Sequence, residues 1–250
     1  MESLKKDLLF HRSVTSLTNQ HMAQWRDKRL LEVSASTVNR ELNLISAVLT
    51  TALKEWGVAL TGNPVRSIKR PANPKSRSRR VSREEQDIIA KHLGWDGCSE
   101  PRTSSQWTAF AFFLAIETAM RRGELTSIRW QDVHLERSYI HLETTKNGEE
   151  RDVPLSSKAK KLLRLLSAKA RHEPLIPVSP DVLTSLFHRA TRQAGLIDLR
   201  FHDSRREATT QLSKKLSNVL ELSAVTGHKS LNMLKIYYKP HASELAKKLE

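Results

Sequence analysis

Four short stretches of the chain hold residue types that can attack, protonate and clamp a phosphate ester: tyrosine, histidine, lysine and arginine. In chain order they are Thr-Ala-Met-Arg-Arg-Gly-Glu-Leu with Arg121 and Glu124, Thr-Lys-Asn-Gly with Lys146, Phe-His-Asp-Ser-Arg with His202 and Arg205, and Thr-Gly-His-Lys-Ser with His228, followed by Tyr237.

These residue types fit an in-line attack on a phosphodiester. Such an attack concentrates negative charge on the non-bridging oxygens, and preorganised guanidinium groups stabilise that charge. A tyrosine hydroxyl has a pKa of about 10, so it attacks well only when a neighbouring group accepts its proton. The departing oxygen is a poor leaving group until an acid protonates it. The set therefore indicates transfer of a phosphate ester to a tyrosine.

Each motif taken alone has an ordinary structural explanation. An arginine pair such as Arg121 and Arg122 is most often a solvated charge on a helix, and a His-x-x-Arg pair on one helical face can be a surface pair. His228 could simply follow a helix that ends at a glycine, and Tyr237 could be an amphipathic anchor. The functional interpretation depends on the order and spacing of all the motifs together.

In that order and spacing the chain resembles the tyrosine recombinase, or phage integrase, family over nearly its whole length. That family has an arginine in a Thr-Gly-Met-Arg-x-x-Glu-like turn, a lysine at a β-hairpin, a His-x-x-Arg motif, and a Gly-His motif nine residues before the nucleophilic tyrosine. Two positions depart from the pattern, since Ala119 stands where glycine is more frequent and Arg206 where histidine often stands. The resemblance assigns the family's site roles to six residues: Arg121, Lys146, His202, Arg205, His228 and Tyr237.

The resemblance and the chemistry together give each residue a role. The two arginines are expected to clamp the phosphate, with Glu124 as the structural companion of Arg121. His202 is the expected base, and His228 is expected to orient the phosphate or the phenol. Lys146 is the expected acid for the leaving 5′ oxygen.

Two adjacent tyrosines compete for the role of nucleophile. The spacing from His228 selects Tyr237. On a helix, Tyr237 and Tyr238 would point about 100° apart. Tyr238 would share a face with Leu231 and Leu234. We expect that face to pack inward, which makes Tyr238 the structural member of the pair.

The resemblance implies a site-specific DNA recombinase or integrase of a phage or other mobile element, which acts through a covalent 3′-phosphotyrosine intermediate. Because the ester keeps the bond energy of the backbone, no cofactor or metal ion is expected. The implied partners are double-stranded DNA recombination sites, further copies of the chain in a homotetramer on DNA, and accessory DNA-bending proteins. Residues 241–249 would either be exchanged between copies or fold back on their own domain.

Three rival functions remain open at this point. A type IB topoisomerase shares the same tyrosine chemistry but relaxes DNA without paired sites. A DNA-binding regulator could carry inert look-alikes of the motifs. A metal nuclease is the weakest rival, because Glu117, Glu124 and Asp203 have no spacing typical of a two-metal cluster.

The elements that must position the motifs are mainly α-helical with a small antiparallel β-sheet, an α+β class. Residues 1–68 are expected to form a helical core-binding domain that binds DNA. Thr18 is the expected cap of its first helix, and a longer helix is expected after Ser36. Since the domain is short for its kind, with no room for an arm-binding domain, we expect a trimmed start. The apolar stripe expected on the longer helix comprises Val38, Leu42, Ile45, Leu49, Ala52, Leu53 and Trp56.

Residues 69–81 are the predicted interdomain linker, since they hold two prolines, six basic residues and no acid. The stretch is either a strap that contacts DNA phosphates or a solvated basic loop.

Residues 82–250 are the predicted catalytic domain. Ser82 and Glu85 form a capping box at its start, and residues 107–116 are apolar enough for a buried core helix. Asn147-Gly148 between two short alternating runs predicts a β-hairpin. Ser179-Pro180 predicts a helix start, with Gly195 as its stop.

Composition agrees with a DNA-binding protein. The 250 residues carry 42 Lys and Arg against 27 Asp and Glu, a formal net charge of +15. Such a charge attracts polyanions. Anionic membrane is the rival partner, but no strongly apolar face accompanies the basic residues. A lone cysteine, Cys98, and no visible signal peptide fit a reducing cytoplasm.

Overall fold

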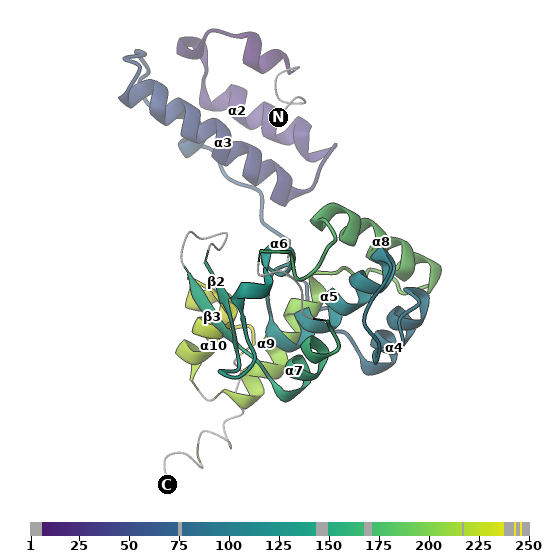
Figure 1. Cartoon of the computed structure of the whole chain (residues 1–250). Coiled ribbons are helices and arrows are strands. Elements are labelled where there is room, and N and C mark those ends of the chain that lie inside the picture. Colours follow the sequence, from purple (N-terminus) through teal and green to yellow (C-terminus); the bar gives the residue numbers. More distant parts are fainter. Residues whose placement is uncertain are drawn as a thin grey trace. The chain divides into compact units, whose positions relative to one another are not determined.

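A computed structural model of the chain describes residues 7–74, 77–143, 150–167, 172–216, 218–237, 243 and 246. The chain divides into two compact units, Met1–Arg77 and Ser78–Glu250, and Figure 1 shows the elements of each. The boundary between the units falls inside residues 69–81, the predicted linker. Helices make up most of the described chain, with one three-stranded antiparallel sheet, which confirms the predicted fold class.

In its described residues, 7–74 and 77, the first unit has two α-helices and three short 3-10 helices. Its elements are η1 (Leu8–His11), η2 (Val14–Ser16), α2 (Asn19–Leu30), α3 (Ala35–Lys54) and η3 (Pro64–Ser67).

The cap of α2 is the one the sequence predicted, while the start of α3 is not. The Thr18 side chain accepts a hydrogen bond from the third backbone N–H of α2, satisfying a free donor of its first turn. Ser34, rather than Ser36, caps α3. The stripe from Val38 to Ala52 is buried as predicted, but Leu53 and Trp56 are 37% and 64% exposed. The helix ends at Lys54, so Trp56 falls outside its periodic face.

The first part of the predicted linker packs on the first unit. Arg26 donates to the carbonyl of Lys69 at 2.5 Å, and the Asn39 amide donates to the carbonyl of Pro71 at 2.8 Å. Arg70 donates to the side-chain oxygen of Asn43 at 2.8 Å. These bonds fix residues 69–71 against α2 and α3.

The second unit holds the rest of the elements. They are α4 (Arg83–His92), α5 (Ser104–Thr118), α6 (Arg122–Ser127), η4 (Trp130–Asp132), β1 (Val133–His134), β2 (Tyr139–Leu142), β3 (Arg151–Pro154), α7 (Ser157–Arg164), α8 (Pro180–Gln193), α9 (Asp203–Lys215), α10 (Val219–Thr226) and α11 (Leu231–Leu234).

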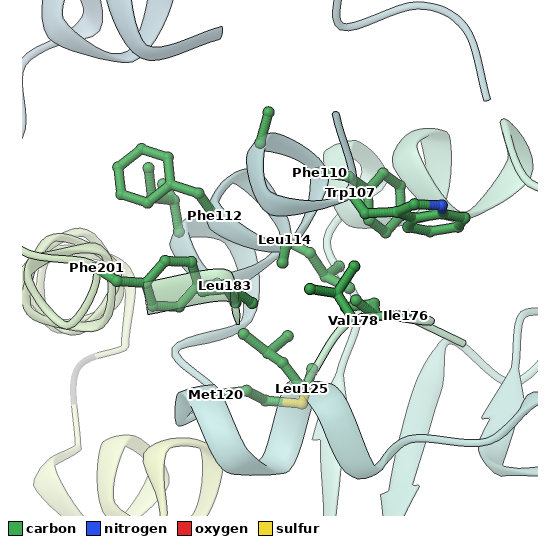
Figure 2. Packing of buried hydrophobic residues seen from close by; sticks show 14 of the residues in the cluster. Trp107, Phe110, Phe112, Leu114, Met120, Leu125, Ile176, Val178, Leu183 and Phe201 are labelled. Atoms are coloured by element: carbon green, nitrogen blue, oxygen red, sulfur yellow. The ribbon is translucent and has the colours of Figure 1, made fainter. Parts of the chain in front are cut away.

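Helix α5 is the central helix of the second unit. It packs against α4, α7, α8 and α9, so it is apolar on every side rather than along one stripe. Phe110, Phe112 and Leu114 are fully buried, and Figure 2 shows them among side chains from the surrounding segments. The buried core helix predicted at residues 107–116 is confirmed.

The sheet has the strand order β1-β2-β3, antiparallel throughout. Strands β2 and β3 form the predicted hairpin, with Leu142 paired to Arg151 and Tyr139 to Pro154. The predicted turn at Asn147-Gly148 lies outside the described residues. Strand β1 was not predicted, because two residues are too few to show a period of two.

Local caps fix several helix starts in this unit. Ser82 and Glu85 form the predicted capping box of α4. Ser179 caps α8 with Pro180 at its first position, and Gly195 follows in the left-handed conformation. Within the described residues, no helix has the length and apolar character needed to cross a membrane.

Candidate active site

Arg121 stands between α5 and α6, where Glu124 fixes both its backbone and its side chain. The backbone N–H and the Nη1 of Arg121 each donate to the Glu124 carboxylate at 2.7 Å. Nη2 of Arg121 donates to the carbonyl of Gly227 at 2.9 Å. The predicted companionship of Arg121 and Glu124 is therefore visible as a double contact, which ties the arginine to a turn 106 residues away.

Arg205 is buried in the first turn of α9, and its side chain reaches the α5–α6 turn and the end of α10. It is 4% exposed. Its Nη1 donates to the carbonyl of Ala119, and its Nη2 donates to the carbonyl of Thr226 at 2.6 Å. Ala119 ends α5 in the left-handed conformation, with φ of 56°. The left-handed conformation favours glycine, which accounts for the frequent glycine at this position in the family that the chain resembles.

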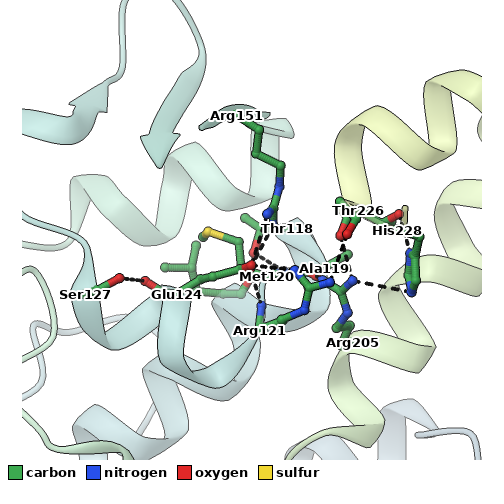
Figure 3. A network of polar contacts seen from close by, with 12 residues as sticks. Thr118, Ala119, Met120, Arg121, Glu124, Ser127, Arg151, Arg205, Thr226 and His228 are labelled. Atoms are coloured by element: carbon green, nitrogen blue, oxygen red, sulfur yellow. Dashed lines mark hydrogen bonds and ion pairs between the residues drawn. The ribbon is translucent and has the colours of Figure 1, made fainter. Parts of the chain in front are cut away.

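His228 follows Gly227, the left-handed cap of α10. The Thr226 hydroxyl donates to the carbonyl of Leu222 at 2.6 Å, so toward His228 it acts as an acceptor, 2.7 Å from Nδ1. The proton of the neutral ring is therefore on Nδ1. Nε2 carries the lone pair and lies 3.4 Å from Nη2 of Arg205. Figure 3 shows the guanidinium groups of Arg121 and Arg205 close together, with the His228 ring next to Arg205.

The arginines and the buried surroundings shift the pKa values of the site. Burial, followed by the positive charges of Arg205 and Arg121, lowers the pKa of His228 to about 4. Burial and the charge of Arg121 lower the pKa of Arg205 to about 10. Burial raises the pKa of Glu124, but hydrogen bonds from Arg151 and Arg121 outweigh this effect and lower the pKa to about 2. At neutral pH the site holds charged arginines, a charged Glu124 and a neutral His228.

His202 is the residue immediately before α9 and has helical backbone angles. It is exposed as a residue, yet partial desolvation of the ring and the charge of Arg205 lower its pKa. The ring is therefore neutral at pH 7, the state in which it can accept a proton.

Tyr237 lies beyond the end of α11 and contacts α9. The Ser213 hydroxyl lies 3.1 Å from its carbonyl oxygen, and the Arg206 guanidinium lies 5.8 Å from the centroid of its ring. Arg206, noted in the sequence as a departure from the common histidine, thus contacts the predicted nucleophile.

Three predicted features lie wholly or partly outside the described residues. They are Lys146, Tyr238 and the tail at residues 241–249, of which only Ser243 and Ala246 are described. The face predicted to bury Tyr238 is only partly confirmed. Leu234 is fully buried, but Leu231 is 40% exposed, because α11 is a single turn.

Arg151 at the start of β3 is a member of the site that the sequence did not reveal. Its two terminal nitrogens donate to the two oxygens of Glu124 at 3.0 and 2.7 Å. Its partner lies 27 residues away on another element, so no local spacing could have shown the pair. A basic residue closely following a predicted hairpin turn was the one available signal.

The last arginines of the predicted linker already have acidic partners. Arg79 forms a bidentate pair with Glu85 of α4. Arg80 forms another with Glu207 of α9, at 2.6 and 2.9 Å. These side chains fasten the start of the second unit to its helices.

Within the described residues, no three His, Cys, Asp or Glu side chains are grouped closely enough to hold a metal ion.

Comparison with known proteins identifies the family. Residues 96–244, more than half of the chain, match the model of the Phage integrase family. The chain belongs to the phage integrase family. Over 96% of its length it is 34% identical to the shufflon-specific DNA recombinase of Escherichia coli. Over 67% of its length it is 33% identical to the tyrosine recombinase XerA of Saccharolobus solfataricus. The chain spans 62% and 55% of the length of these two relatives.

Solved structures of integrases share the fold of this phage integrase family member. The integrase of transposon Tn1549, in complex with transposon right end DNA, has a TM-score of 0.77 and 14% identity, covering 99% of this chain and 89% of that one. A lambda integrase tetramer bound to a Holliday junction has a TM-score of 0.64 and 21% identity, covering 86% and 65%. At these identities the likeness is one of fold.

Proposed function

We propose that this phage integrase family member is a site-specific DNA recombinase that cuts and rejoins DNA through a covalent 3′-phosphotyrosine at Tyr237. The observation that carries the proposal is that Arg121 and Arg205 converge on the carbonyls of residues 119, 226 and 227, with Nε2 of His228 next to the Arg205 guanidinium. Such a cluster of fixed donors suits a ligand with several anionic oxygens, and a DNA phosphodiester is that ligand.

The two arginines clamp the non-bridging oxygens of the phosphate. Their backbone contacts hold the guanidinium groups in place before DNA binds, so little reorganisation is needed when negative charge develops. His228 is neutral in the free protein, with its lone pair on Nε2. A bound phosphate raises the pKa of the ring, so Nε2 gains a proton and donates to a phosphate oxygen.

Tyr237 attacks the phosphorus, and His202 accepts the phenolic proton as the P–O bond to the 5′ oxygen breaks. The lowered pKa of His202 keeps the ring ready to accept that proton. Lys146, which lies in the sequence between β2 and β3, supplies a proton to the departing 5′ oxygen. Religation runs through the same steps in reverse, and it needs no nucleotide because the ester conserves the bond energy.

The names of the relatives support DNA recombination sites as the substrate. The Escherichia coli relative is a shufflon-specific DNA recombinase, and lambda integrase was solved both as a dimer on a core site and as a tetramer on a Holliday junction. We therefore place this chain on paired duplex sites of a phage or other mobile element, as a homotetramer with accessory DNA-bending proteins. Residues 1–68 bind DNA as a core-binding domain, and a DNA substrate places the protein in the cytoplasm.

A nicked suicide substrate tests this function. DNA flanking the gene supplies candidate sites. A nick near the cleavage point lets the short fragment with the free 5′ hydroxyl diffuse away, so religation is prevented and the protein stays on the 3′ phosphate. The wild type should form a detergent-resistant adduct, whereas Tyr237→Phe should bind the DNA equally well and form none.

Two outcomes would contradict the proposal. Binding of site DNA without adduct on any nicked substrate would indicate a regulator with an inert site. Relaxation of supercoiled plasmid that lacks such a site, without recombination of paired sites, would indicate a topoisomerase.

A further inference from the structure

Arg151 lies on the side of Glu124 that Arg121 does not occupy. Its side chain is 11% exposed, and that of Glu124 is 4% exposed. The two carboxylate oxygens receive the fork of Arg151 and, at the same time, two donors of Arg121. The orientation of Arg121 therefore depends on the Glu124 carboxylate, which Arg151 fixes through two hydrogen bonds.

Arg151 also packs against the turn that precedes His228. Gly227 has a φ of +65°, and a Cβ atom there would lie 2.7 Å from Nη1 and 2.8 Å from Cζ of Arg151. The guanidinium thus fills the space that a side chain at residue 227 would need. The carbonyl of the same glycine accepts from Arg121, so one residue joins both arginines to the His228 turn.

The third connection of Arg151 is through the backbone of the hairpin. Arg151 is the first residue of β3 and pairs with Leu142, the last residue of β2. The Arg151–Glu124 pair therefore fixes the ends of β2 and β3 relative to α6.

We infer that Arg151 is a positioning residue for the proposed cleavage of DNA. Through Glu124 it orients the Arg121 fork, and against Gly227 it supports the His228 turn. This inference rests on the proposed function, and it adds a residue that acts through others rather than on the phosphate itself.

Arg151→Lys is the first test, because lysine keeps the charge and loses the fork. An ammonium cannot hold both oxygens of Glu124 in a fixed plane. A displacement of about 1 Å in a reacting group costs about 10²-fold in rate. We expect single-turnover cleavage at saturating protein to slow by about this factor, with DNA affinity close to that of the wild type.

A double-mutant cycle separates positioning from a general loss of stability. Arg151→Met, Glu124→Gln and the double variant are compared in the same cleavage assay. Because Arg151 also contacts Gly227, part of its effect bypasses Glu124, and the double variant should be less slow than the product of the two single losses. If the two losses multiply in full, the residues act independently and the inference fails.

The leaving group gives a second discrimination. A bridging 5′-phosphorothiolate leaves as sulfur without protonation, so it should rescue Lys146→Ala. It should leave most of the Arg151→Lys defect in place, since the phosphate clamp still lacks its geometry. Full rescue of Arg151→Lys would overturn the assignment of Arg151 to the clamp.

Arg79→Lys is the matched control, since it breaks a bidentate pair with Glu85 of α4 in the same unit. It should cleave at the wild-type rate, and every variant is assayed below its own unfolding midpoint. Wild-type cleavage by Arg151→Lys, with adduct formed normally, would overturn this inference and leave the proposed function standing. A wild-type protein that forms no adduct would instead overturn the proposed function.

Discussion

The second unit contains two groups of arginine–glutamate ion pairs, and the two groups have different roles. At its start, Arg79 and Arg80 each have a glutamate of their own, Glu85 and Glu207. In the candidate site, one carboxylate, Glu124, pairs with two guanidinium groups, those of Arg121 and Arg151, while Arg205 donates to backbone carbonyls.

The difference lies in the charge that remains after pairing. The first group is neutral and closes on itself, so it serves the fold. The second keeps an excess of positive charge, and its arginines complete their hydrogen bonds with the carbonyls of Ala119, Thr226 and Gly227. Positive charge that is held by neutral carbonyl acceptors remains available to an anion, and we therefore propose the second group as the phosphate site.

Removal of one arginine from each group should give the largest contrast. Arg205→Ala takes a preorganised donor from the phosphate, so cleavage should fall by about 10²–10³-fold. Arg80→Ala leaves the buried Glu207 with its bonds from Val81 and Gln211 but without a cationic partner, which should lower the free energy of unfolding by about 1–3 kcal/mol. Cleavage at saturating protein should be nearly unchanged in Arg80→Ala. Single-turnover assays and urea unfolding on both variants measure the two quantities, and equal loss of cleavage would erase the contrast.

Gly227→Ala should slow cleavage through the site, and Gly195→Ala supplies its matched control. The two glycines have φ of +65° and +67°, so alanine is strained by about 1–2 kcal/mol at either position. A Cβ at Gly195 would meet nothing within 4 Å, whereas at Gly227 it would meet Arg151. Both variants should lose stability in urea unfolding, Gly227→Ala at least as much as Gly195→Ala, and Gly227→Ala alone should lose about tenfold or more in cleavage rate. Equal cleavage by the two variants would show that the contact with Arg151 has no functional weight.

The pH dependence of stability should report the excess charge of the site. The folded pKa of His228 is about 4, below its ordinary value. The unfolded state therefore binds a proton that the folded state does not, and stability falls as pH drops from about 6.5 to 4. The slope contributed by one such group is at most about 1.4 kcal/mol per pH unit. Urea unfolding of His228→Gln should show a shallower slope in this window than the wild type. Parallel curves would mean that the ring is not held neutral by the arginines.

The salt dependence of DNA binding tests the paired group directly. Two arginines bound to phosphates would contribute about 1.8 to the slope of log K against log salt. Because Arg79 and Arg80 are held by glutamates, Arg79→Ala with Arg80→Ala should leave the slope nearly unchanged. Arg66→Ala with Lys69→Ala is the comparison, since both side chains are exposed and have no acidic partner in the described part of the chain. A flatter slope in the first variant would make the linker a phosphate strap after all.

The sequence predicted what depends on short range. Caps such as Thr18, Ser82 and Ser179 are local hydrogen-bond chemistry, and all three are found. The apolar residues of α5 form no single stripe because the helix is buried on all sides, yet the length of the apolar run still predicted a core helix. Where a helix ends is less local, and the exposed Trp56 of the first unit was assigned to the buried stripe in error.

The candidate site divides in the same way. Motif spacing predicted Arg121, Arg205 and His228, which the structure brings together. The role of Arg151 could not be read from spacing, because its contacts with Glu124 and Gly227 cross from one element to another. The engagement of Arg80 with Glu207, 127 residues away, was hidden for the same reason.

The residue that carries the DNA tests the central claim most directly. Wild-type adduct trapped on a nicked suicide substrate is digested with trypsin and nuclease, and the peptide that holds Tyr237 and Tyr238 is fragmented to locate the remaining nucleotide. We predict that the phosphate is on Tyr237, that Tyr237→Phe gives no adduct, and that Tyr238→Phe still gives one. A nucleotide on Tyr238, or an adduct that survives Tyr237→Phe, would contradict the account.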